Sequence, residues 1–136
     1  MRREKGFTLL ELIIVVIVIG ILASVALPRY IRTAEKGRVA EAKSILGSIR
    51  DAQIRYAAQW NNFTTVINNL DVSFQTKYFT YAAAPGPGLD PLLDSTVVGV
   101  ATRNTSVEYS AGFGGAYTVN ITNGGNYSIS NNTYLL

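Results

Sequence analysis

The 136-residue chain contains no cysteine and no histidine. Disulfides, thiolate zinc sites, cysteine nucleophiles and Ser-His-Asp triads are therefore excluded. Charged residues make up only 15% of the chain, and its net charge is +3 at pH 7. Because Arg2, Arg3 and Lys5 crowd into the first five residues, this basic balance says little about nucleic acid. A domain without disulfides must be held together by packing, hydrogen bonds, an ion or neighbouring subunits.

An apolar run follows this basic leader. Residues 12–28 carry no charge, and with residues 7–10 they approach the ~20 residues that span a bilayer as a helix. Glu11 interrupts the run, and an ionised side chain at the bilayer centre is unfavourable by roughly 2.5–3.5 kcal/mol. Because basic residues precede the run, the positive-inside tendency places the leader in the cytoplasm and the C-terminal part outside.

Two ordinary interpretations of the run are open. A cleaved secretory signal would end at a small residue such as Ala26, although the apolar core before it is long for a signal. A plain signal anchor fits the length and the charge, but it explains neither Gly6 nor Glu11.

A third interpretation rests on residues 5–11, which read Lys-Gly-Phe-Thr-Leu-Leu-Glu. This segment closely resembles the prepilin cleavage motif of type IV pilins and of the pseudopilins of type II secretion. The resemblance extends to Gly20 and Pro28 and ends near residue 55. It implies that a prepilin peptidase cuts after Gly6 and that the new amine, on Phe7, is methylated.

The resemblance also assigns roles in assembly. The Phe7 amine of one subunit would neutralise Glu11 of a neighbour and set the axial register, whereas the plainer alternative is an interfacial acid that reaches water. Gly20 and Pro28 weaken the helix between them. That stretch is expected either to extend or melt in a filament or to remain a static kink.

Residues 29–60 predict an amphipathic continuation of the helix, to about Gln59. Its apolar stripe is expected to hold the outer domain and consists of Ala42, Ile45, Leu46, Ile49, Ala52, Tyr56 and Trp60. Asp51 and Arg55, four residues apart, predict an ion pair that supports the helix. The basic residues that follow the run are expected to be solvated at the outer membrane interface or paired with acids of neighbouring subunits: Arg29, Arg32, Lys36 and Arg38.

Residues 61–136 predict a β-rich head. Strands are expected at 78–84, 96–103, 115–122 and 126–130, with part of another at 107–113 and a short turn at 66–70. Asn123-Gly124-Gly125 is typical of a hairpin turn. The predicted fold class is α+β, a long N-terminal helix on three or four antiparallel strands. Its segments are the leader 1–6, the apolar helix 7–28, the amphipathic helix 29–60 and the head 61–136.

Few residues suggest chemistry. Asp90 and Asp94 are candidate calcium ligands in a loop, and no other cofactor is expected. Five asparagines begin an Asn-x-Ser/Thr sequence and are candidate glycosylation acceptors: Asn62, Asn104, Asn120, Asn126 and Asn131.

The sequence thus favours a non-enzymatic type IV pilus subunit that sits in the cytoplasmic membrane and then polymerises into an external helical filament. The implied partners are its own copies, the prepilin peptidase, and an assembly platform with an ATPase motor. The alternatives are a minor pilin, a periplasmic major pseudopilin of type II secretion, and a binding or enzyme domain that uses the run only as a membrane tether. DNA binding, known for some pilins of competence systems, is a weaker alternative.

Overall fold

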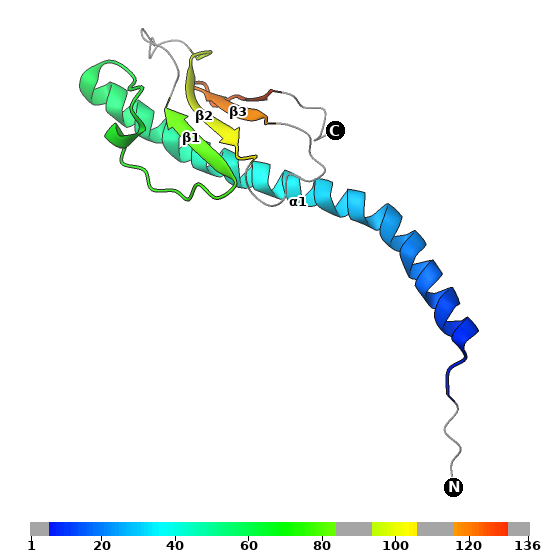
Figure 1. The fold of residues 1–136 in the computed structure, drawn as a ribbon. Coiled ribbons are helices and arrows are strands. Elements are labelled where there is room, and N and C mark those ends of the chain that lie inside the picture. Colours follow the sequence, from blue (N-terminus) through cyan, green and yellow to red (C-terminus); the bar gives the residue numbers. More distant parts are fainter. Residues whose placement is uncertain (1–5, 84–93, 106–115, 131–136) are drawn as a thin grey trace. The chain divides into compact units, whose positions relative to one another are not determined.

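A computed structural model describes residues 6–83, 94–105 and 116–130 of the chain (Figure 1). The chain divides into two compact units, residues 1–35 and residues 36–136. One long helix, α1 (Leu9–Trp60), contributes to both units. The first unit is helical throughout its described residues after Thr8, and the second combines the rest of α1 with a sheet.

Helix α1 is continuous through Pro28, although this proline has no N–H to donate to the carbonyl of Ser24. The helix ends where Asn61 adopts a left-handed conformation, with φ of 54°, and donates its N–H to the Ala57 carbonyl at 2.7 Å. Such a residue closes a helix and turns the chain away. The predicted end near Gln59 is thus confirmed within one residue.

Four antiparallel strands form a sheet in the order β1-β2-β3-β4 within the described residues (Figure 1). Their bounds are β1 (Phe79–Ala83), β2 (Val97–Arg103), β3 (Thr118–Thr122) and β4 (Tyr127–Ile129). The hairpin between β3 and β4 is confirmed at the predicted turn, where Gly125 has φ of 82° and bonds to the Thr122 carbonyl at 2.9 Å. A short 3-10 helix, η1 (Ile67–Asn69), confirms the predicted turn, and residues 107–113 lie outside the described residues.

The core of the second unit lies between one face of α1 and one face of the sheet, which confirms the α+β fold class. At its centre Gly99 of β2 lets the sheet approach the helix, because a Cβ there would stand 3.2 Å from Leu46, Ile49 and Ile121. The principal buried residues are Val39, Ala42, Leu46, Ile49 and Ala52 from the helix and Phe79, Val98, Ala101, Val119 and Ile121 from the strands.

Polar contacts fasten α1 to the other elements. The buried amide of Gln53 donates to the carbonyls of Thr64 at 2.8 Å and Val98 at 3.3 Å, and accepts from the Thr64 N–H at 3.0 Å. Arg50 donates from Nε to the Asn123 carbonyl at 2.6 Å, and the Tyr127 hydroxyl donates to the Lys43 carbonyl at 3.0 Å. These hydrogen bonds therefore fix the position of α1 relative to the loop at Thr64 and to the β3–β4 hairpin.

Two predictions about this helix were wrong. Trp60 was expected in the buried stripe, but it is 63% exposed and its ring lies beside that of Tyr56. The last buried residue of the helix is Gln53, so the packed part of the stripe ends before Trp60. Asp51 and Arg55 do not pair with each other. The loop after η1 brings Asp71 to 2.6 Å from Arg55, while Asp51 lies 3.4 Å from Arg50.

Candidate functional site

The start of α1 is set by Thr8. Its hydroxyl oxygen accepts the N–H of Glu11 at 3.2 Å, and its carbonyl accepts the N–H of Leu12 at 3.2 Å. This is the threonine half of a capping box, in which a residue before the helix satisfies an N–H of the first turn. Glu11 consequently stands in the first turn, where the helix dipole favours an anion.

Gly6 and Phe7 precede the cap in non-helical backbone. The side chain of Phe7 is 84% exposed, and a Cβ placed on Gly6 would meet no atom within 4 Å. The peptide bond between these residues is therefore reachable by an enzyme without opening the helix. Cleavage there would leave a new amine four residues before Glu11.

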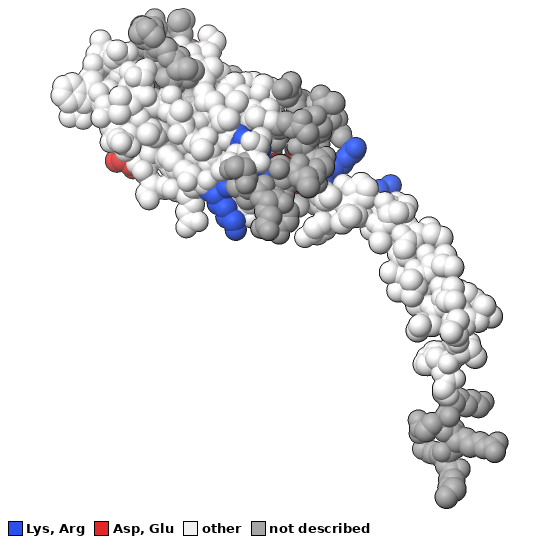
Figure 2. Space-filling model, in the orientation of Figure 1, with Lys and Arg blue, Asp and Glu red and all other residues white. Residues whose placement is uncertain are grey.

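The first unit exposes a long apolar surface. The large hydrophobic side chains from Phe7 to Leu27 have exposed fractions between 46% and 84%, and this helix is apolar and long enough to cross a membrane. The visible face of this stretch carries no charged side chain (Figure 2). Such a surface needs lipid or protein to cover it.

Gly20 and Pro28 both lie inside the continuous helix. Hydroxyl groups bond to backbone carbonyls around the proline, with Ser24 on Ile21 at 2.7 Å and Thr33 on Arg29 at 3.0 Å. The structure gives the helical state of this stretch, and its extension on assembly stays a prediction.

The four basic residues after the apolar run differ in their surroundings. Arg29, Arg32 and Lys36 are exposed. Arg38 is half-buried, and its guanidinium carbon lies 4.5 Å from the centre of the Tyr78 ring. Arg38 therefore packs within the second unit, and the place of the other three at a membrane interface stays a prediction.

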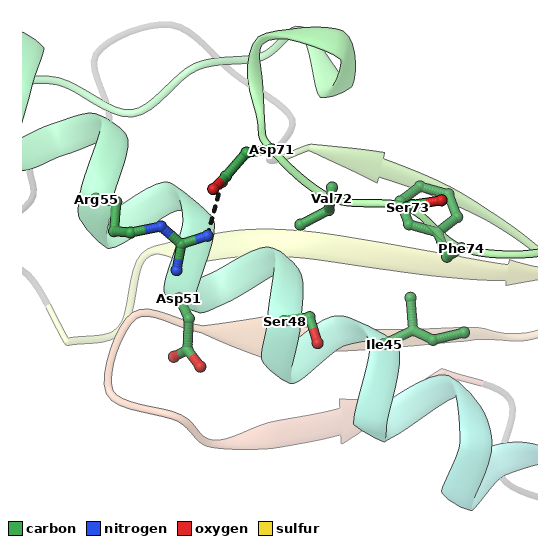
Figure 3. A pocket seen from close by; sticks show the side chains of 8 residues that line it. All are labelled: Ile45, Ser48, Asp51, Arg55, Asp71, Val72, Ser73 and Phe74. Carbon is green, nitrogen blue, oxygen red and sulfur yellow. Dashed lines mark hydrogen bonds and ion pairs between the residues drawn. The ribbon is translucent and has the colours of Figure 1, made fainter.

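A groove of about 340 Å³ lies in the second unit between α1 and the segment 71–74 (Figure 3). It is lined by Ile45, Ser48, Asp51, Arg55, Asp71, Val72, Ser73 and Phe74. The hydrogen bond from Arg55, with its positive charge, holds the pKa of Asp71 below its usual value. Sequence reasoning missed this groove, because segment 71–74 has no pattern that places it beside the helix.

The remaining candidate residues are dispersed. Asn62 and Asn126 are exposed, Asn104 and Asn120 are half-buried, and Asn131 lies outside the described residues. Asp94 is exposed in a turn, where its carbonyl accepts the Gly124 N–H at 2.9 Å, whereas Asp90 lies outside the described residues. The described ranges contain no cluster of three or more acidic side chains.

Two protein-family models match the chain. The model described as a prokaryotic N-terminal methylation motif matches residues 1–27, which hold the capped helix start and most of the apolar run. The model described as type IV pilin-like G and H matches residues 39–132. The two matches together cover the exposed helix and the domain built on its second half.

Curated relatives show the same likeness. The chain is 37% identical to the type IV major pilin protein PilA of Myxococcus xanthus over 68 residues, covering 50% of this chain and 31% of the relative. It is 36% identical to the type II secretion system core protein G of Aeromonas hydrophila, covering 52% and 49%. A fimbrial protein of Pseudomonas aeruginosa is 31% identical over 111 residues, covering 78% and 72%.

The chain thus spans about a third and a half of the first two relatives. The fimbrial match, at 111 residues, is too long to be confined to α1 and extends into the outer domain. No solved structure gives a significant match.

Proposed function

The chain belongs to the type IV pilin-like family, and we propose that it is the structural subunit of an extracellular helical filament. The observation that carries this proposal is the apolar half of α1, exposed along its length and interrupted by a single carboxylate. In the membrane, lipid covers that surface. After extraction, the same surface of other copies covers it.

Processing precedes assembly in this proposal. The leader charges hold the N-terminus at the cytoplasmic face, and the prepilin peptidase cuts after Gly6. Exposure of the Gly6–Phe7 segment outside the helix supports such access. Methylation then occurs on the Phe7 amine. An assembly platform and its ATPase motor, implied by the family, draw the subunit from the bilayer, and the subunit has no catalytic task of its own.

The Phe7 amine and Glu11 set the register between subunits. A carboxylate entering an apolar bundle must be neutralised, since an unpaired buried charge is strongly unfavourable. The amine of a neighbouring copy supplies the opposite charge. Both groups lie near the start of α1, with Glu11 four residues after Phe7, so each subunit offers one donor and one acceptor within about one helical turn.

The proposal predicts that Glu11→Ala and Glu11→Gln leave membrane insertion and cleavage intact but abolish most surface filament. Immunoblots of sheared filaments and membrane fractions measure both steps. Glu41→Ala is the matched control, because Glu41 is an exposed glutamate in the same helix. Normal filaments from the Glu11 variants would contradict the register role and favour a simple tether.

The first experiment shears producing cells and determines the N-terminus of the collected protein by mass spectrometry. N-methyl-Phe7 in abundant external filaments would support the pilin assignment. An intact leader confined to membranes would overturn it.

A second candidate function is that of a type II secretion pseudopilin, favoured by the likeness to core protein G of Aeromonas hydrophila. Processed subunits that remain in the cell envelope would support this candidate. Calcium binding through Asp90 and Asp94 is a proposal tied to it, and a rise in melting temperature with calcium, reversed by a chelator, would test that proposal.

A further inference from the structure

The groove beside α1 combines two kinds of wall. Ile45, Val72 and Phe74 pack against the core and make its apolar part. Asp51 and Asp71 stand at the charged end with Arg55 (Figure 3). Asp51 lies 3.4 Å from Arg50 and Asp71 lies 2.6 Å from Arg55, but the two acidic side chains are still 64% and 74% exposed and can accept further hydrogen bonds. Apolar and charged surfaces therefore lie next to one another within one groove.

This arrangement suits a lysine side chain. Lysine places a methylene stem on apolar surface and keeps its ammonium group at the polar edge. Carboxylates provide charge-assisted hydrogen bonds for that ammonium. Because the Arg55 contact lowers the pKa of Asp71, this carboxylate stays ionised at neutral pH.

The chain offers one suitable lysine on its described surface. Lys43 and Lys77 already lie over tyrosine rings, 5.4 Å from the Tyr127 centre and 5.2 Å from the Tyr78 centre. Lys36 is exposed and has no ion pair or ring contact in the described ranges. It stands fifteen positions before Asp51 on α1, about 22 Å along the axis, so it cannot enter the charged end of its own groove.

We propose that the groove receives Lys36 of a second copy of the chain. The inference rests on the proposed filament and names one of its side contacts. Because Lys36 and the groove are different patches, each copy can place its Lys36 in the groove of one neighbour and receive the Lys36 of another neighbour in its own groove. Such a heterologous contact propagates instead of closing into a dimer. It also adds an electrostatic preference for one neighbour at a fixed axial offset.

Engineered cysteines test the contact, because the chain has none of its own. Ala40→Cys lies one turn after Lys36, and Ser73→Cys lies in the groove, so both leave the charged groups in place. Filaments of the double variant are treated with a short bismaleimide and run on a denaturing gel. The expected result is a ladder of dimers, trimers and higher multimers, whereas each single variant yields dimers at most.

Ala40→Cys with Ala82→Cys is the matched control, since Ala82 is exposed on β1 and does not line the groove. This pair is expected to give no ladder. Adding Lys36→Gln to the groove pair should abolish most of the ladder, while Lys36→Arg should retain it. Should the double variant not polymerise, the two single-cysteine subunits are co-expressed, and the readout is dimer in excess of that from either single variant alone, which Lys36→Gln should remove.

Intact filaments without the ladder would overturn the inference and leave the proposed function standing. A ladder as strong in the Ala82 control, or one unaffected by Lys36→Gln, would overturn it too. If the unaltered chain forms no filaments, the proposed function fails, and the inference fails with it.

Discussion

Glu11 and Asp71 are carboxylates whose roles have different origins. Glu11 is the only charged residue between Phe7 and Pro28, so the role proposed for it follows from its position in an uncharged run. Asp71 has no such context in the sequence. It gains one when the loop after η1 brings it to 2.6 Å from Arg55. A charge within an apolar stretch can thus be recognised from the sequence, whereas an ion pair between residues far apart in the chain cannot.

Tyr81 gives a prediction about pH. Burial, followed by the negative charge of Glu41, raises the pKa of Tyr81 from 10.0 to about 12. Between these values the unfolded chain loses the phenol proton and the folded chain keeps it. The contribution of Tyr81 to the free energy of unfolding is therefore complete below pH 10 and is lost as the pH rises from 10 to 12.

Tyr81→Phe should reduce the fall in stability over that interval, because the ring contact with Phe74 at 4.8 Å can persist without a titrating hydroxyl. Chemical denaturation of both proteins at several pH values measures the difference. Parallel curves between pH 10 and 12 would contradict the assignment of this titration to Tyr81.

At the scale of the element, α1 and β2 approach closely only because Gly99 has no side chain. A Cβ at Gly99 would stand 3.2 Å from three core side chains, whereas one at Gly47 of α1 would lie 3.7 Å from the Tyr127 hydroxyl, an ordinary contact. The two glycines therefore differ in their effect on stability. One serves packing between elements, and the other only weakens a helix.

Gly99→Ala should lower the free energy of unfolding by about 1–3 kcal/mol, because the core has no room for the added methyl group. Gly47→Ala should raise it by up to about 1 kcal/mol through helix propensity. Urea denaturation of both variants beside the unaltered protein provides the measurement. Equal effects of the two substitutions would show that close packing at Gly99 is not limiting.

At the scale of the whole molecule, the two units bury their apolar groups in different ways. All buried hydrophobic residues of the described ranges lie from Val39 onward, while the apolar side chains of residues 7–27 are exposed. The second unit therefore has its own core, whereas the apolar surface of the first needs lipid or protein to cover it. In the proposed filament, folding therefore rests on the second unit, and the main contact between copies rests on the apolar half of α1.

A protein comprising residues 29–136 should accordingly fold, remain monomeric and form no filaments. Circular dichroism and thermal unfolding should show a cooperative transition, because the buried hydrophobic residues are retained. Sedimentation tests the monomeric state. A protein without a cooperative transition would show that the apolar half is needed for the core to form.

Much of the architecture was predictable because its signals are local. The apolar run, the 3.6-residue stripe and Asn123-Gly124-Gly125 fix a helix, its buried face and a hairpin through residues close in the chain. Residues 5–11 predicted the processing residues Gly6 and Phe7 and the register role of Glu11 through their resemblance to the prepilin motif, and these roles stay predictions. Trp60 shows the limit of this reasoning, because the stripe continues in sequence after its buried part has ended.

The sequence by itself determined the long helix, the membrane-length run with its single acid, and the hairpin, because each depends on local spacing and hydrophobicity. Only the tertiary structure decided that Arg55 pairs with Asp71, that Gly99 admits the helix, and that segment 71–74 forms a groove. These features join residues far apart in the chain. Their partners are chosen by how the loop and sheet pack on α1, which no local pattern specifies.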